Sequence, residues 1–418
     1  GSAGLGVRVS GATDNSAAGR ILAGGAGSFS TGRLDNTDGQ LVAGHSLVLR
    51  ADGGIANLRG LVAAENTLSI GAAGLDNTDG SLQALRGALG LELGGELANR
   101  RGLVLAGGDL HAGAGSLDNS GTLYAGGNAF VAVRGDVANS TFIGANGSLN
   151  LTAGQLASAA ASLLGAGIRS DGSLAASGDL NVAADGTLSA VGQNLAGGRL
   201  AFGGSSVDLA GSRTQAGDIV LHAAAGDILT ADARILTPGT LVLSARSDDT
   251  RRVDNRRGEL LAGHLDIQAA NLDNREGRLV GSGPAATRLV LAAPDGLLDN
   301  RSGFIAGNGV DFLLGAGSLF NANGRIEHAG AGLLDIRADT LDNSYGTVAG
   351  NGSLHLQGKV IANVGGLVAA TSLAIDAIDF DNRSGGLLGG AGSADIVATR
   401  LFDNRLGSVA GKGDTTLT

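Results

Sequence analysis

A tripeptide that integrin-type receptors recognise stands in the first third of the sequence. It is Arg134-Gly135-Asp136, within VRGDVAN at 133–139. The same turn recurs as DGGIAN at 52–57 and GGELAN at 94–99, so the repeat itself already calls for glycine there. Two interpretations stay open: adhesion to a host-cell receptor through this turn, or an ordinary turn beside a variable polar position.

Arginines form a second candidate site, because they follow a recurrent asparagine through the later half of the chain. In a stack of repeats, equivalent guanidiniums would repel one another unless negative charge lies between them. That charge comes either from the neighbouring aspartates or from a bound sulfated or acidic glycan. The arginines that we single out as glycan-binding candidates are Arg256, Arg257, Arg275 and Arg301.

Residues for metal or redox chemistry are sparse. Six histidines, at positions 45, 111, 222, 264, 328 and 355, lie far apart with no ligand spacing, and there is no cysteine. We therefore expect no metal site, no cofactor and no disulfide. The absence of thiols is compatible with export from the cell.

The composition limits the class of protein. Glycine accounts for 75 of 418 residues and proline for 3, yet 43% of the residues are hydrophobic, which is too many for a disordered chain. The formal net charge of −10 argues against nucleic-acid binding. No apolar run is long enough to insert into a membrane. The sequence thus predicts a large core of small aliphatic side chains.

An asparagine-centred turn recurs about every 20 residues and defines the repeat. Its consensus is Leu-x-Asn-x-x-Gly-x-Leu-x-Ala-Gly-x-x-Leu-x-Leu. Between turns, segments such as SLVLR (46–50) and LGLEL (89–93) alternate apolar and polar residues, as β-strands do. The asparagines that recur in this register include Asn36, Asn57, Asn77, Asn99, Asn119, Asn255, Asn274, Asn300, Asn321, Asn343, Asn363, Asn382 and Asn404.

Short strands cannot bury a face alone, but stacked copies of the same coil can. The sequence therefore predicts an all-β parallel β-helix (β-solenoid) with about 20 residues per coil and about 20 coils. With a rise of about 4.8 Å per coil, it would be a monomeric rod about 100 Å long. At each corner the asparagine is expected to take the left-handed conformation and to bond its amide to the next amide in a ladder.

Three stretches of the solenoid are distinguished by their turns. Residues 1–140 and 251–418 carry the asparagine turns, whereas 141–250 keep the glycines and the alternation but lose the Asp-Asn turn. We interpret the middle stretch as the same solenoid with a different corner. A longer step near 279–298 contains Pro284 and Pro294, and because proline is excluded from internal strands, an external loop is expected there.

The repeats resemble the haemagglutinin-repeat region of filamentous haemagglutinin-type exoproteins. That family includes adhesins and the stalks of contact-dependent growth-inhibition toxins. The segments that carry the resemblance are LDNTDGQLVAG, LDNREGRLVGSG, LDNRSGFIAGNG, LDNSYGTVAGNG and FDNRLGSVAGKG. The resemblance implies a right-handed helix, and secretion to the surface of a Gram-negative bacterium through a dedicated outer-membrane partner.

The function expected from these features is structural and adhesive. We expect an internal shaft of a secreted surface adhesin that attaches to host cells or other surfaces. The alternative is the stalk of a contact-dependent growth-inhibition toxin, and a less favoured one is a β-helix protein that binds or cleaves polysaccharide. No enzyme is expected, because no group of carboxylates and basic residues departs from the repeat together.

Overall fold

The computed structural model describes residues 3–245, 251–291 and 295–418. All regular structure in these residues is β-strand, with no helix, in a parallel β-solenoid of about 19 turns and roughly 21 residues per turn. The fold class and the length of the coil predicted from the sequence are thus confirmed. The chain forms two compact units, Gly1–Ser205 and Ser206–Thr418, which are described separately below.

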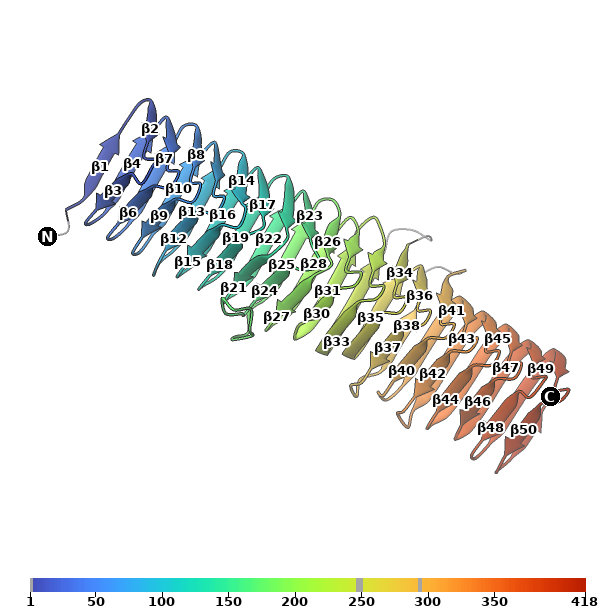
Figure 1. Cartoon of the computed structure of the whole chain (residues 1–418). Coiled ribbons are helices and arrows are strands. Elements are labelled where there is room, and N and C mark those ends of the chain that lie inside the picture. The colour runs from blue at the N-terminus through green and yellow to red at the C-terminus, as the bar shows by residue number, and fades with distance from the viewer. Residues whose placement is uncertain (1–2, 246–250, 292–294) are drawn as a thin grey trace. The chain divides into compact units, whose positions relative to one another are not determined.

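Each coil of the first unit consists of three short strands. Strands of successive coils lie side by side in Figure 1 and pair in parallel without a shift in register, so that Leu47, Leu68 and Leu89 stack, as do Leu49, Ile70 and Leu91. Three such coils contain β7 (Leu47–Ala51), β8 (Gly54–Ala56), β9 (Leu61–Ala64), β10 (Leu68–Ala72), β11 (Gly74–Asp76), β12 (Ser81–Ala84), β13 (Leu89–Leu93), β14 (Glu96–Asn99) and β15 (Leu103–Ala106).

In most coils of the second unit, two of the three strands are fused into one long strand. The long strands are β33 (Arg234–Ala245), β35 (Glu259–Ala269), β41 (Phe312–Phe320), β43 (Leu333–Asp342), β45 (Ser353–Ala362), β47 (Ser372–Asp381) and β49 (Ala394–Asp403). The short strands between them include β42 (Arg325–His328), β44 (Thr347–Gly350) and β46 (Leu367–Ala370). The pairing stays parallel throughout, for example between β43 and β45.

The core follows directly from the alternation of side chains along each strand. In β7 and β19 (Ala129–Val133), buried and exposed residues alternate one by one, because successive side chains of a strand point to opposite faces. Leucine, isoleucine, valine and alanine fill the interior, with few rings; Phe202, Phe312 and Phe380 are among its largest side chains. Small aliphatic residues suit this interior because every coil must match the next.

The recurrent turn places its asparagine inside the solenoid. The side chain of Asn36 is fully buried, and its Nδ2 donates to Asn57 Oδ1 at 2.7 Å, so that amides of successive coils form a column. The glycine three residues after the asparagine has no space for a side chain. A Cβ on Gly39 would lie 2.1 Å from the Asn15 backbone oxygen.

The expectation that the asparagines take the left-handed conformation is wrong. The positive φ angles fall two residues later, at Asp38 (58°), Arg59 (53°), Asp79 (55°) and Arg101 (53°). The amide of each asparagine must point inward to meet its neighbours in the column, so the reversal of the backbone is left to the next exposed position. These left-handed positions stack on the outer corner of the solenoid.

Departures from the repeat are confined to a few coils. In the first unit, the stretch after β24 (Leu163–Ala166) leaves the coil and returns at β25 (Leu180–Ala184), with an antiparallel bridge between Ile168 and Leu174. The sequence prediction missed this excursion. In the second unit, the Pro284 backbone oxygen accepts from Val310 N at 3.1 Å. Pro294 lies outside the described residues, and the external loop near 279–298 stays a prediction.

Candidate functional site

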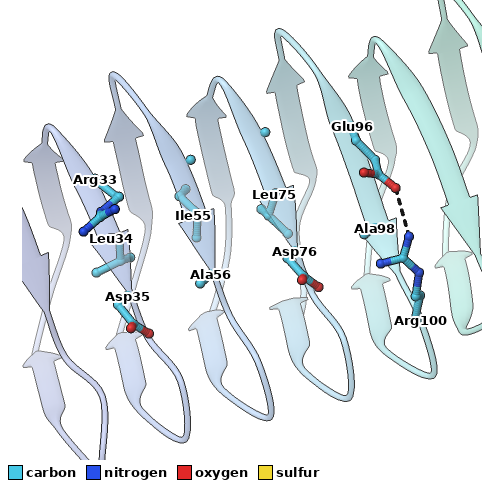
Figure 2. A pocket seen from close by; sticks show the side chains of 12 residues that line it. Arg33, Leu34, Asp35, Ile55, Ala56, Leu75, Asp76, Glu96, Ala98 and Arg100 are labelled. Atoms are coloured by element: carbon cyan, nitrogen blue, oxygen red, sulfur yellow. Dashed lines mark hydrogen bonds and ion pairs between the residues drawn. The ribbon is translucent and has the colours of Figure 1, made fainter.

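A shallow groove on the outer face of the first unit is a candidate site (Figure 2). It crosses β5 (Arg33–Asp35), β8, β11 and β14 and has a volume of about 490 Å³. The floor of the groove is low because the residues that face outward there have small side chains or none. These residues are Gly54, Ala56, Gly74 and Ala98. The leucines and isoleucine between them point into the core, as the alternation of the strand requires.

The charged rim of this groove is largely engaged by its own coils. Arg100 pairs with Glu96 at 3.1 Å, the dashed line in Figure 2, and with Asp118 at 2.6 Å. Asp76 accepts from the backbone N and the hydroxyl of Thr78. The hydrogen bond to Asp118 raises the pKa of Arg100, which keeps the guanidinium charged. The groove thus offers an open surface with polar edges rather than converging catalytic groups.

The predicted receptor tripeptide lies on a corner of the first unit. Arg134 and Asp136 are exposed and Gly135 is half-buried between β19 and β20 (Asp136–Asn139). The Gly135 N donates to the Gly115 backbone oxygen at 2.8 Å, and Arg134 donates to the Gly94 oxygen at 2.6 Å. The guanidinium therefore lies back along the corner over an earlier coil. Receptor binding at this turn stays a prediction.

The candidate glycan-binding arginines lie on a corner of the second unit, and three pair within their own turn. Arg256, Arg275 and Arg301 each donate through Nε and an Nη to the aspartate two residues earlier. Two of these carboxylates, Asp254 and Asp299, are buried, with side chains only 3% and 6% exposed. The aspartates of these turns therefore supply the negative charge that keeps the guanidiniums from repelling one another.

The fourth arginine of this group belongs to a different column. Arg257 has a φ of 56° and pairs with Asp232 of the preceding coil at 2.7 Å. The hydrogen bond from Arg257 lowers the pKa of Asp232. All four arginines therefore have protein partners, and binding of an acidic glycan to them stays a prediction.

The sequence prediction missed the alternating charges at the left-handed positions of the first unit, which are the second residues after successive asparagines. Asp38 pairs with Arg59 at 2.7 Å, and Asp79 pairs with Arg101 at 2.6 Å, each pair linking consecutive coils. The signal was present in the sequence, because the second residue after successive asparagines reads Asp, Arg, Asp, Arg. Such exposed pairs add little stability each, but they set which coils match.

The asparagines form two hydrogen-bonded columns, one in each unit. In the first, Asn139 ends the run of amides and donates to Ser158 Oγ at 3.1 Å. In the second, Thr230 Oγ1 donates to Asn255 Oδ1 at 3.0 Å, and the run continues to Asn404. Bonds of 2.6–2.8 Å join neighbouring amides, at Asn15, Asn36, Asn57, Asn77, Asn99, Asn119 and Asn139, and at Asn255, Asn274, Asn300, Asn321, Asn343, Asn363, Asn382 and Asn404.

Two absences apply to the part of the chain that the structure describes. It holds no group of three or more histidine, aspartate or glutamate side chains placed to bind a metal ion. It also has no helix with the length and apolar character to cross a membrane.

The fold and the recurrent turns together fit a filamentous haemagglutinin-type exoprotein, the class that the sequence resembles. Among known proteins, the chain is 38% identical over 180 residues to the Toxin CdiA of Yersinia pestis, and 39% identical over 101 residues to the tRNA nuclease CdiA-2 of Burkholderia pseudomallei strain 1026b. These matches cover 43% and 24% of this chain.

The chain corresponds to only a small part of each relative. The chain spans only 5% of the first relative and 3% of the second. No family model matches the chain, and no solved structure matches it. The activities in the relatives' names therefore belong to those proteins.

Proposed function

We propose that this chain is a stalk segment of a secreted toxin-type exoprotein on the surface of a Gram-negative bacterium. The observation that supports the proposal is the similarity of the chain to Toxin CdiA and to tRNA nuclease CdiA-2, combined with coils that pair in register. In such a stalk the function is mechanical, because stacked coils hold other parts of a protein at a distance. Secretion through an outer-membrane partner belongs to the same proposal.

Under the same proposal, this segment has no enzymatic activity of its own. The carboxylates on the rim of the groove are held by their own turns, and the described arginines of the corner are paired with aspartates. General acid–base catalysis needs a group that is free to reach a substrate.

A deletion in register tests the stalk in the producing bacterium. Removal of residues 57–98 joins Ala56 to Asn99, which brings Asn99 next to Asn36 and Arg101 next to Asp38. The shortened solenoid therefore keeps both the amide column and the alternating charges. We expect normal surface display and retained inhibition of neighbouring cells, measured by protease accessibility and by competition in co-culture.

The matched control removes residues 57–88, which breaks the register by half a coil. It should abolish display, because Leu89 would then follow Ala56 in the place of the buried Asn57, so that a strand meets a turn of the adjoining coil and the amide column is interrupted. If the deletion of 57–98 is displayed normally but no longer inhibits neighbours, the segment has an activity of its own and the stalk proposal is wrong.

Adhesion is the second candidate, because Arg134 and Asp136 are both exposed on one corner. The test is cell attachment to surfaces coated with the chain and with its Asp136→Glu variant, which keeps the charge but lengthens the side chain. Unchanged attachment would exclude this tripeptide. For an acidic glycan at the arginine corner, retention on a heparin column should fall when Arg256, Arg257, Arg275 and Arg301 are changed to glutamine.

A further inference from the structure

One aromatic side chain of the second unit lies on the outer corner, at a position where most other coils have small or polar residues and a later coil has the exposed Leu406. Tyr345 stands in the turn between β43 and β44, and it is 67% exposed. Its φ is 56°, a left-handed conformation that is uncommon for a bulky residue. The other tyrosine of the chain, Tyr124, is buried and donates its hydroxyl hydrogen to the Ile168 oxygen.

The glycine at the equivalent position of the next coil leaves space for the Tyr345 ring. A Cβ on Gly365 would lie 2.7 Å from Tyr345 Cε1 and 2.8 Å from its Cδ1. The ring therefore occupies the space that the next side chain of the column would take. Gly365 also has a left-handed φ of 64°, so a larger residue there is disfavoured twice.

The neighbours of the ring along this corner are polar. Asn323 holds the equivalent position in the preceding coil, and Ser384 holds it in the second coil after Tyr345. Both have left-handed φ angles of 56° and are exposed. Backbone bonds from Asn323 N to the Ser344 oxygen and from Tyr345 N to the Val364 oxygen stack these turns on one another. An amide, a ring and a hydroxyl thus follow one another within a few coil steps, each step roughly 4.8 Å.

Contact with the turn at Gly365 covers only part of this ring, which remains 67% exposed. A bulky side chain in a left-handed position carries a strain of about 1–3 kcal/mol, and a ring that remains largely exposed gains little from burial. Tyrosine has an apolar body and a polar tip, and it is enriched at binding interfaces. Arg383, which lies beside Ser384 in the same turn, is already paired with Asp381 at 2.8 Å, so its charge is not free for an anion.

We propose that Tyr345, Asn323 and Ser384 form a binding site for a neutral polysaccharide that runs along this corner. The apolar face of a pyranose ring stacks on the tyrosine, and its hydroxyl groups bond to the amide and the hydroxyl on either side. The site is independent of the proposed stalk function, because a stalk needs no ligand.

Tyrosine fluorescence reports on this site directly. The chain has no tryptophan and two tyrosines, of which only Tyr345 is exposed. The probes are cellohexaose, chitohexaose and maltoheptaose, titrated up to about 1 mM and confirmed by calorimetry. We expect saturable binding of at least one of them, with an affinity that falls tenfold or more in Tyr345→Ala.

Two further variants test whether binding depends on the Tyr345 ring and on its position. Tyr345→Phe keeps the ring, so calorimetric binding should stay within about threefold of the parent, roughly 0.7 kcal/mol. Gly365→Ala keeps the tyrosine but displaces the ring, so it should weaken binding although Tyr345 is present. Far-UV circular dichroism of each variant checks that the solenoid is intact.

Three results would overturn the proposal. One is that none of the three saccharides binds, and another is that binding is equal in the parent and Tyr345→Ala. The third is that binding is lost in Leu387→Ala but not in Tyr345→Ala, since Leu387 is 48% exposed on β48 (Leu387–Gly390). That result would place the saccharide site on β48 and not on the Tyr345 corner. A change in growth inhibition alone would bear on the stalk and not on this site.

Discussion

Replacement of one rung of the amide column measures how strongly the column holds the coils together. Asn321 lies in the middle of the second column and is fully buried. Its Nδ2 donates to Asn343 Oδ1 at 2.7 Å and to the Thr347 oxygen at 3.1 Å, and its Oδ1 accepts from Asn300 Nδ2 at 2.7 Å. Asn321→Ala removes all of these bonds and leaves the backbone of the turn unchanged.

The magnitude follows from the partners that are left behind. Each lost hydrogen bond costs about 1 kcal/mol, and a buried group left without a partner costs about 1–3 kcal/mol. Asn300 keeps other acceptors, the backbone oxygens of Gly303 and Arg325. Asn343 Oδ1, however, loses its amide donor from the preceding coil. We expect a local loss of about 3 kcal/mol of unfolding free energy.

Hydrogen exchange followed by mass spectrometry is the suitable assay, because coils in a repeat protein can open locally. A loss of about 3 kcal/mol corresponds to exchange that is roughly 150-fold faster in peptides that cover residues 300–347. Asn308→Ala is the control, since Asn308 is exposed and makes a single 3.3 Å bond to the Ser282 oxygen. Equal exchange in the two variants would refute the reasoning that the column stabilises the fold.

Three other predictions concern the corners of the coils. Gly324→Ala should lower the unfolding free energy by about 3 kcal/mol or more, measured by urea unfolding, because its Cβ would lie 2.2 Å from a backbone oxygen of the previous coil. Arg59→Gln should lower the thermal midpoint slightly, and the difference should vanish in about 1 M salt, because its partner Asp38 is exposed. Burial opposes the charged form of Asp273, but hydrogen bonds from Arg275 outweigh it and lower the pKa of Asp273. That stabilisation is present above the pKa of the unfolded aspartate, about 3.9, and is lost as the pH falls through the lower folded value, so Arg275→Gln should unfold in acid at a higher pH.

The results that would contradict these three predictions are distinct. An unchanged urea midpoint in Gly324→Ala would show that the corner can widen without cost. A loss in Arg59→Gln that persists at high salt would point to packing rather than charge. Equal acid midpoints for the parent and Arg275→Gln would mean that the Asp273 pair makes no net contribution.

The sequence was sufficient for the fold because one physical constraint repeats in every coil. Each amide must meet the amide of the next coil, and each following glycine must pass close to a backbone oxygen, as at Gly39 and Gly80. Asparagine meets the first condition and glycine meets the second, so the spacing of these two residues gives the number of residues per coil. The alternation within segments such as 46–50 then identifies which side chains face the core.

Other features do not follow from spacing alone. The left-handed position two residues after most of the asparagines tolerates Asp38, Arg59 and Tyr345 alike, so no residue type marks it. The excursion after β24 contains ordinary polar residues and is anchored from a distance, by the Tyr124 hydroxyl on the Ile168 oxygen. Whether an arginine pairs within its turn or across coils depends on side-chain geometry, as the different partners of Arg256 and Arg257 show.

The amide column also has a direction. Every Nδ2 in it points toward the later coil, and bonds to backbone oxygens such as those of Gly80 and Leu103 fix the orientation of the Asn77 amide. The amide dipoles therefore align head to tail and polarise one another. A newly folded coil always meets a donor that is already in place and has only to present an oxygen to it. The solenoid can thus be extended from its earlier coils toward its later ones, in the direction from the amino terminus to the carboxyl terminus.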